Sequence, residues 1–324
     1  MATVYTTVDA HNVAPLHFNT SHTGILADGK PFLFKGLTWR GAEMPAMVPL
    51  GLSSHSIDHY LNFMQREGFN SIRLTFDHEH VLKNAIVPEA IAETKLAHAS
   101  ELIELPYTHI FAEIAKAAAR RGILIVLACG RISPSLAPGA QGSGSWYSDS
   151  ISEDLVLRSW QRMAKTTCAL WNVVGVDLMD KPYKSSWGSG EPATDWQSAA
   201  ARIGNHVLRL CPRWLVFAQG VGANPGAGPL GADGLGLENP LEIGFFMGEN
   251  LIGAKRQPIA LEIPSRLVYA PTSFGPSTYP FDFFAFGKFP QNMPDVWKIK
   301  FGAIHDELAV MKHCLWHGRV GKIE

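Results

Sequence analysis

Short apolar runs alternate with amphipathic stretches along most of the 324-residue chain, and this alternation limits the possible folds more than any other feature. The helical spacing of apolar residues predicts helices over 56–68, 108–122 and 195–212, each of which ends at Gly or Pro. Runs that are apolar throughout are typical of parallel strands covered on both faces. We expect strands at 32–39, 71–76, 123–130, 173–179, 214–220, 266–274 and 319–324.

This succession of strands and helices predicts an α/β fold, and a (β/α)8 TIM barrel rather than an open doubly wound sheet. No G-x-G-x-x-G follows an early strand, so the signature of a dinucleotide-binding fold is absent. We expect an N-terminal extension over 1–23 and a single barrel domain over 24–324. In this interpretation the chain lacks the eighth strand, which leaves an open barrel edge.

Composition and charge favour no special class of partner. The formal net charge of −1 gives no general attraction for nucleic acid. No run of 18 or more apolar residues predicts a transmembrane segment. The first residues lack the basic and apolar regions of a signal peptide, so the localisation stays open. We predict no cofactor.

The cysteine and histidine spacings are weak evidence for metal or disulfide chemistry. His78 and His80 follow a predicted strand, but two histidines without a third ligand make a poor metal motif, and we predict no metal. No cysteine pair has C-x-x-C spacing, and three cysteines lie in apolar segments. We interpret the cysteines as small buried hydrophobic residues: Cys129, Cys168, Cys211 and Cys314.

Four segments at predicted strands carry a likeness to a known family. They read DGKPFLFKGLTWRGAE (28–43), GFNSIRLTF (68–76), WNVVGVDLMDKP (171–182) and RLVYAPTSFGPSTY (266–279). Together they resemble glycoside hydrolase family 5, the retaining endo-β-1,4-glucanases or cellulases, over almost everything from Gly24 to Glu324. The resemblance implies a TIM barrel with its cleft at the carboxyl ends of the strands.

The resemblance also implies two catalytic glutamates, one as acid/base after the fourth strand and one as nucleophile after the seventh. A retaining glycosidase needs such carboxyl groups about 5 Å apart. In this chain the matching positions hold Lys181, within Asp180-Lys181-Pro182, and Lys322. Two ammonium groups reverse the field that meets a positively charged transition state. We therefore expect a catalytically inactive barrel.

Further residues of the matching segments are expected to line the cleft. In the family, Arg73 holds the nucleophile, whereas Thr272 and Phe274 replace a His and a Tyr. Lys181, Lys322, Arg73 and Arg131 predict a cationic pocket for an anion or acidic sugar, unless the lysines pair with Asp180 and neighbouring acids. The predicted cleft residues are Trp39, Arg73, Arg131, Asp180, Trp187, Thr272 and Phe274.

The loss of both carboxylates favours a structural or assembly subunit of a larger complex. We expect a protein partner over the open barrel edge and the aromatic-rich segment 279–289, although that segment could instead stack on a glycan. Two alternatives remain open. The first is an active endoglucanase with displaced carboxylates such as Asp180, and the second is a pseudoenzyme that binds carbohydrate without cleaving it. Relatives in the family are mostly secreted.

Overall fold

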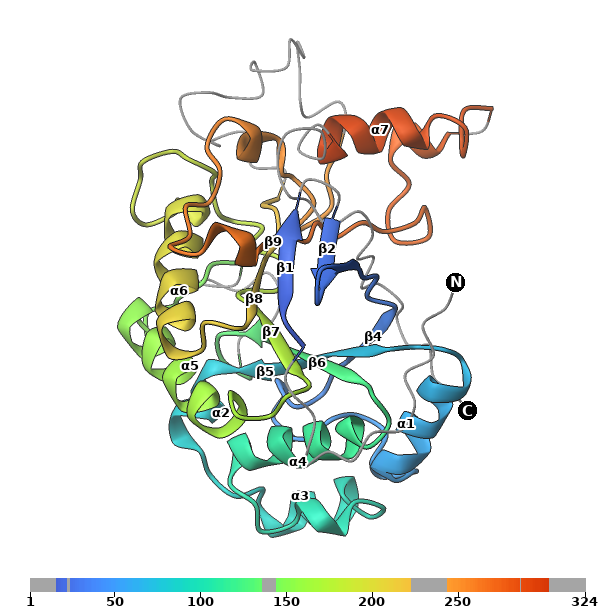
Figure 1. Cartoon of the computed structure of the whole chain (residues 1–324), viewed down its shortest axis with the longest axis vertical. Helices are drawn as coiled ribbons and strands as arrows, with labels where there is room; N and C mark the ends of the chain where they lie inside the picture. Colours follow the sequence, from blue (N-terminus) through green and yellow to red (C-terminus); the bar gives the residue numbers. More distant parts are fainter. Residues whose placement is uncertain (1–15, 22–23, 136–143, 223–243, 286, 303–324) are drawn as a thin grey trace.

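Six parallel strands form the central sheet of the protein (Figure 1). The structure is a computed structural model, and it describes residues 16–21, 24–135, 144–222, 244–285 and 287–302. The strands follow one another in chain order: β4 (Gly36–Trp39), β5 (Ser71–Asp77), β6 (Leu124–Arg131), β7 (Val173–Asp177), β8 (Leu215–Ala218) and β9 (Leu267–Tyr269). They confirm the first six predicted strands, whereas the seventh, at 319–324, lies outside the described residues.

Helices follow the strands and cover the outside of the sheet (Figure 1). In the part of the chain that is described, none is long and apolar enough to cross a membrane. The α-helices are α1 (Ile57–Arg66), α2 (His78–Lys83), α3 (Glu89–Lys95), α4 (Tyr107–Ala119), α5 (Glu153–Thr167), α6 (Trp196–Leu210) and α7 (Met293–Lys300). Short 3-10 turns occupy Ser100–Leu102, Ile252–Lys255, Pro264–Arg266 and Asp282–Phe284.

A three-stranded antiparallel sheet precedes the barrel strands and packs against their interior. It consists of β1 (Phe18–Ser21), β2 (Gly24–Ala27) and β3 (Lys30–Pro31). Phe18 and Phe34 belong to the same buried cluster as Leu124, Val174 and Leu215, near the amino ends of β6, β7 and β8. The apolar hairpin therefore fills this end of the interior. The domain boundary at residue 24 remains a prediction, with β1 and β2 paired across it.

The period of two along the strands separates two buried surfaces. In β6, Leu124 and Val126 pack into the interior cluster, whereas Ile125 and Leu127 pack under the helices. All seven residues of β5 are buried, and Arg73 is among them. A buried arginine requires partners for its charge. The interior is thus apolar near the amino ends of the strands and polar toward their carboxyl ends.

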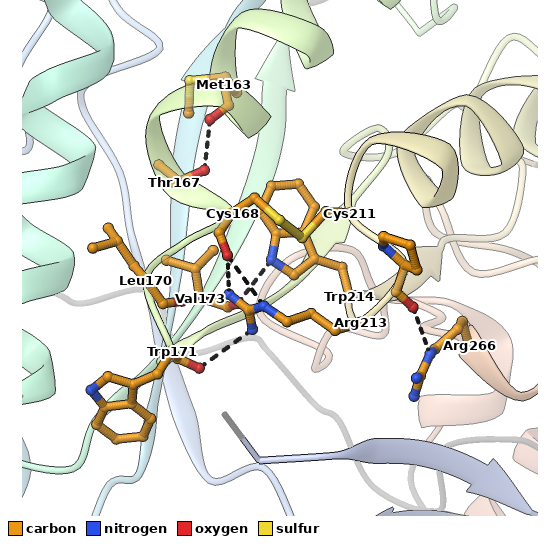
Figure 2. Close-up of a disulfide and its surroundings, with 11 residues drawn as sticks. Met163, Thr167, Cys168, Leu170, Trp171, Val173, Cys211, Arg213, Trp214 and Arg266 are labelled. Atoms are coloured by element: carbon orange, nitrogen blue, oxygen red, sulfur yellow. Dashed lines mark hydrogen bonds between the residues drawn. A yellow bond between two sulfur atoms is a disulfide. The ribbon is translucent and has the colours of Figure 1, made fainter. Parts of the chain in front are cut away.

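A disulfide joins Cys168 to Cys211 at the carboxyl ends of α5 and α6 (Figure 2). Our interpretation of these two cysteines as isolated hydrophobic residues is therefore wrong. They are 43 positions apart in the sequence, and only the packing of consecutive helices brings them together. Cys129 is buried and free, as predicted, and Cys314 lies outside the described residues.

Arg213 stabilises the carboxyl end of α5, next to the disulfide, by hydrogen bonds (Figure 2). Its guanidinium donates to the carbonyl oxygens of Cys168, Leu170 and Trp171, just beyond the end of α5. These bonds satisfy backbone acceptors at the end of a helix and place a positive charge there. Burial lowers the pKa of Arg213 to about 10. Arg213 and the disulfide therefore hold the same helix end.

Replacing both Cys168 and Cys211 with serine is expected to lower the free energy of unfolding by about 2–4 kcal/mol. The cross-link spans 43 positions and restricts the unfolded chain, so its loss raises the entropy of that state. Urea denaturation of the two proteins measures the difference. Cys129→Ala controls for the loss of a buried sulfur, and equal midpoints for the double variant and the parent would contradict the prediction.

Candidate functional site

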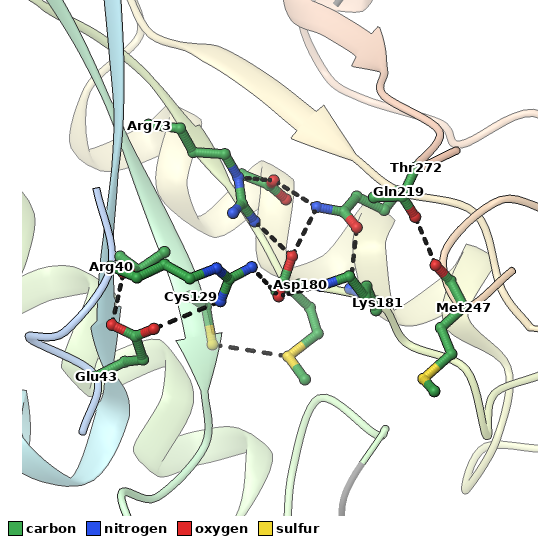
Figure 3. A network of polar contacts seen from close by, with 12 residues as sticks. Arg40, Glu43, Arg73, Cys129, Asp180, Lys181, Gln219, Met247 and Thr272 are labelled. Carbon is green, nitrogen blue, oxygen red and sulfur yellow. Dashed lines mark hydrogen bonds and ion pairs between the residues drawn. The ribbon is translucent and has the colours of Figure 1, made fainter. Parts of the chain in front are cut away.

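A buried network of charged side chains joins Arg73 of β5 to the carboxyl ends of β7 and β8 (Figure 3). Arg73 donates from Nε to Asp177 Oδ2 (2.8 Å) and from Nη2 to Asp180 Oδ1 (3.0 Å). Gln219 Nε2 donates to the same Asp177 oxygen at 2.8 Å. The side chains of Arg73, Asp177 and Asp180 are 2%, 4% and 6% exposed. One guanidinium thus holds two carboxylates together at the strand ends.

The two carboxyl groups have opposite pKa shifts. Burial raises the pKa of Asp177, because the single charge of Arg73 does not outweigh it. Burial also works to raise the pKa of Asp180, but Arg73, Lys181 and Arg40 outweigh it and hold that pKa well below its ordinary value. Asp180 is therefore a carboxylate at neutral pH, whereas Asp177 accepts a proton more readily.

Arg40 extends the network to the residues after β4 (Figure 3). Its Nη2 donates to Asp180 Oδ2 at 3.0 Å, and its Nη1 donates to Glu43 Oε1 at 3.4 Å. Glu43 in turn accepts hydrogen bonds from the Gly41 amide (2.7 Å) and the Thr75 hydroxyl (2.6 Å). Within the described residues, Arg40 and Arg73 each lie against two carboxylates, so the cations of this network are compensated.

Lys181 lies at the tip of the segment that follows β7. Its φ of 58° is in the left-handed region, which is uncommon for a residue with a side chain. Its backbone N–H donates to Gln219 Oε1 at 3.0 Å, and its Nζ donates to Asp180 Oδ2 at 3.0 Å. The side chain is 21% exposed. Burial lowers the pKa of Lys181 although Asp180 opposes the shift. The structure confirms the predicted pairing of Lys181 with Asp180.

Three other predicted residues lie at the ends of neighbouring strands. Thr272 and Phe274 follow β9; Thr272 is buried and donates to the Met247 carbonyl at 2.5 Å. The centre of the Phe274 ring lies 5.8 Å from Lys181 Nζ. Trp39 ends β4, and its indole N–H donates to the Leu50 carbonyl at 2.9 Å. Phe274 therefore lies beside the network.

The remaining predicted residues lie elsewhere or are not described. Arg131 ends β6 and donates to the Pro134 carbonyl at 3.5 Å. Trp187 is 3% exposed and donates to the Gln257 carbonyl, so its indole is packed in the core. Lys322 lies outside the described residues.

The DHEH segment after β5 has structural contacts of its own. Asp77 accepts a hydrogen bond from the His80 amide, and His78 Nδ1 lies 2.8 Å from the Ser159 hydroxyl. Burial raises the pKa of Asp77 and lowers that of His78 to about 3. Across the ranges that the structure describes, no three His, Cys, Asp or Glu side chains are grouped so as to hold a metal ion.

A second buried ion pair joins α7 to the segment after β8. Lys300 Nζ donates to Glu249 Oε2 at 2.8 Å, and both side chains are 1% exposed. Glu249 also accepts from the Ser273 hydroxyl at 2.8 Å and from the Phe246 amide at 2.9 Å. Four aromatic rings lie within 4.1–5.7 Å of Lys300 Nζ, those of Phe245, Phe246, Phe281 and Phe283.

Part of the aromatic-rich segment 279–289 is therefore packed around a lysine of the same chain. Tyr279 and Phe289 are 58% and 39% exposed. A protein partner over this segment and over the barrel edge remains a prediction.

Sequence reasoning missed several residues of these networks. Arg40 follows the run that became β4, and Gln219 follows the run that became β8. Both are polar residues next to a strand end, and that position could have identified them. Glu249 and Lys300 had no comparable signal.

The profile of the family "Cellulase (glycosyl hydrolase family 5)" matches residues 25–307. The chain belongs to glycoside hydrolase family 5. The fold comparisons below agree with this assignment and confirm the predicted α/β (β/α)8 barrel.

Two curated relatives of the family 5 chain are endoglucanases. That of Paenibacillus polymyxa is 31% identical over 298 residues, which cover 91% of this chain and 69% of the relative. The major extracellular endoglucanase of Xanthomonas campestris pv. campestris is 30% identical, with 88% of this chain and 54% of the relative covered. An endocellulase from Pyrococcus horikoshii, in complex with cellotetraose, has a TM-score of 0.78 at 29% identity and covers 91% of this chain and 80% of its own.

These relatives contradict our expectation that the family 5 chain is an inactive structural or assembly subunit. The matched proteins are endoglucanases, and the match covers 88% and 91% of the present chain. The expectation rested on the replacement of both catalytic carboxylates by lysine, and the similarity to endoglucanases over most of the chain overturns it.

Proposed function

We propose that this family 5 chain is an endoglucanase-type hydrolase of β-1,4-glucans. The observation that carries the proposal is its similarity to an endoglucanase across 91% of its length. The charged network at the strand ends supports it, because the active sites of TIM barrels lie at that face.

The chain is, in this proposal, a divergent member of the family with Lys181 at the acid/base position and Lys322 at the nucleophile position. An ammonium with a lowered pKa is a better proton donor to a glycosidic oxygen than an ordinary lysine. After donation, the neutral amine can take a proton from an attacking water. Proton transfer is therefore the part of the reaction for which Lys181 provides a group.

A second candidate function is glucan binding without cleavage, and the identity of Lys181 favours it. The transition state of glycoside hydrolysis is oxocarbenium-like and positive. A protonated lysine repels this charge, whereas a carboxylate stabilises it. Asp180 offsets the repulsion only in part, because it already accepts from Arg40 and Arg73.

The release of reducing ends from carboxymethylcellulose, measured from about pH 4 to about pH 9, tests the proposed activity. If Lys181 is the proton donor, activity falls as the pH rises through its lowered pKa, because the ammonium is lost. Lys181→Met is expected to reduce the rate by about 10²–10⁴-fold. Lys95→Met, on the exposed end of α3, is the matched control.

Calorimetric titration with cellotetraose separates the two candidates. Turnover by the unmodified chain that is lost in Lys181→Met supports the hydrolase. Binding without turnover supports the second candidate, and the absence of both overturns both. A gain of turnover in Lys181→Glu would show that a carboxylate at this position suits the rest of the site better.

A further inference from the structure

The amino group of Lys181 shares one carboxylate oxygen with a guanidinium. Lys181 Nζ and Arg40 Nη2 each lie 3.0 Å from Asp180 Oδ2, while Arg73 Nη2 lies 3.0 Å from Asp180 Oδ1. Asp180 therefore faces three cations with a single negative charge. The side chains of Lys181 and Arg40 are 21% and 38% exposed, so this corner of the network is open to small molecules.

Two further carboxyl groups pair with the guanidiniums of this cluster. Glu43 lies 3.4 Å from Arg40, and Asp177 lies 2.8 Å from Arg73. Guanidinium groups keep their protons at any ordinary pH. Lysine is the cation of this cluster that can lose one. Release of a proton from Lys181 relieves the repulsion, in agreement with the lowering of its pKa by burial and by the neighbouring guanidiniums.

We propose that Lys181 is a covalent capture site for aldehydes, which it binds as an imine. The lone pair of the neutral amine attacks the carbonyl carbon, and the carbonyl oxygen takes up a proton to give a carbinolamine. Loss of water then forms the C=N bond, so that amine and aldehyde yield imine and water without oxidation or reduction. The ligand class is an aldehyde, either a small hydroxyaldehyde or the open-chain reducing end of a sugar.

The neighbours of Lys181 provide the groups that this addition needs. Asp180 accepts a hydrogen bond from the amine and fixes its orientation. Arg40 lies on the same carboxylate oxygen and brings a positive charge near an oxygen anion that develops beside Nζ. The centre of the Phe274 ring lies 5.8 Å from Nζ and places an apolar surface beside the amine. The nucleophile and the orienting carboxylate are thus adjacent in the segment after β7, and the anion donor comes from the segment after β4.

Reductive trapping in the full chain tests the proposal. The protein is incubated near pH 7 with glycolaldehyde or with cellobiose, in each case with cyanoborohydride, which reduces the imine to a stable secondary amine. Peptide mass spectrometry then compares Lys181 with the exposed Lys95. Each unit by which a pKa is lowered raises the fraction of free amine about tenfold. Because burial lowers the pKa of Lys181, we expect Lys181 to be modified faster than Lys95.

The variants separate capture from ordinary lysine chemistry. Arg40→Met retains Lys181 and is expected to slow its modification, whereas Lys95→Arg leaves it unchanged. If only glycolaldehyde modifies Lys181, the ligands of the site are small aldehydes. If cellobiose also modifies Lys181, the site accepts the open-chain reducing ends of sugars. A rate for Lys181 equal to that of Lys95 with both aldehydes would overturn the proposal. Only the cellobiose arm rests on the proposed function, and trapping without hydrolysis would support capture while counting against the hydrolase.

Discussion

Arg73→Met is expected to lower the free energy of unfolding by about 3–5 kcal/mol at neutral pH. Methionine keeps most of the apolar stem but removes the charge that Asp177 and Asp180 share at 2.8 and 3.0 Å. Both carboxylates are nearly inaccessible to water, so water cannot replace the lost hydrogen bonds. Urea denaturation near pH 7 measures the loss. Arg66→Met removes an exposed ion pair with Glu67 and is expected to cost less than about 1 kcal/mol.

The decrease in the free energy of unfolding caused by Arg73→Met is also expected to depend on pH. In the parent protein the pKa of Asp180 lies well below its ordinary value, so this group contributes stability above about pH 4 that is lost as the pH falls further. The raised pKa of Asp177 has the opposite effect on stability, because a group with a raised pKa favours the folded state as the pH falls. Without Arg73 the stabilisation of ionised Asp180 is largely absent. The difference in free energy of unfolding between Arg73→Met and the parent should therefore become smaller near pH 3.5. A gap of equal size at both pH values would contradict this explanation.

The second large effect is expected from Lys300→Met, which should also cost about 3–5 kcal/mol. Glu249 would keep its hydrogen bonds from Ser273 and Phe246 but would lose its counter-ion in a site that is 1% exposed. The four phenylalanine rings around Nζ would lose a cation as well. Thermal and urea unfolding measure the change, with the exposed Lys298→Met on the same helix as control.

A double variant distinguishes the loss of the ion pair from simple repacking. Lys300→Met combined with Glu249→Gln removes the isolated charge and is expected to recover most of the lost stability, because exchange of both partners of a buried pair is often close to neutral. If the double variant is as unstable as Lys300→Met alone, the cost comes from packing around the aromatic rings rather than from Glu249.

The strand pattern was predictable because it is local. Apolar runs of a few residues located six strands of the sheet, and the family resemblance of the matching segments identified Arg73, Asp180 and Lys181. The contacts of these residues could not be predicted from the local pattern. Asp177 ends β7 and Asp180 lies three residues beyond it, yet both side chains reach Arg73.

Contacts between segments that are distant in the sequence could not be predicted from the local pattern of residues. Glu249 and Lys300 are 51 positions apart and meet only after α7 has packed against the segment that follows β8. The pKa of Lys181 is likewise a property of the assembled network, because burial lowers it and residues from several strand ends modify it. The sequence shows that a lysine stands at position 181, but it does not show which partners and how much burial set the pKa of that lysine.

The bond between Cys168 and Cys211 makes the stability of this barrel depend on the redox potential of its surroundings. A glutathione-buffered cytosol keeps most protein thiols reduced, whereas secretory and periplasmic compartments allow disulfides to persist. The same sequence produced in these two settings would give two preparations of different resistance to unfolding. Activity and stability measured on a preparation therefore describe the protein only together with the state of these two sulfurs.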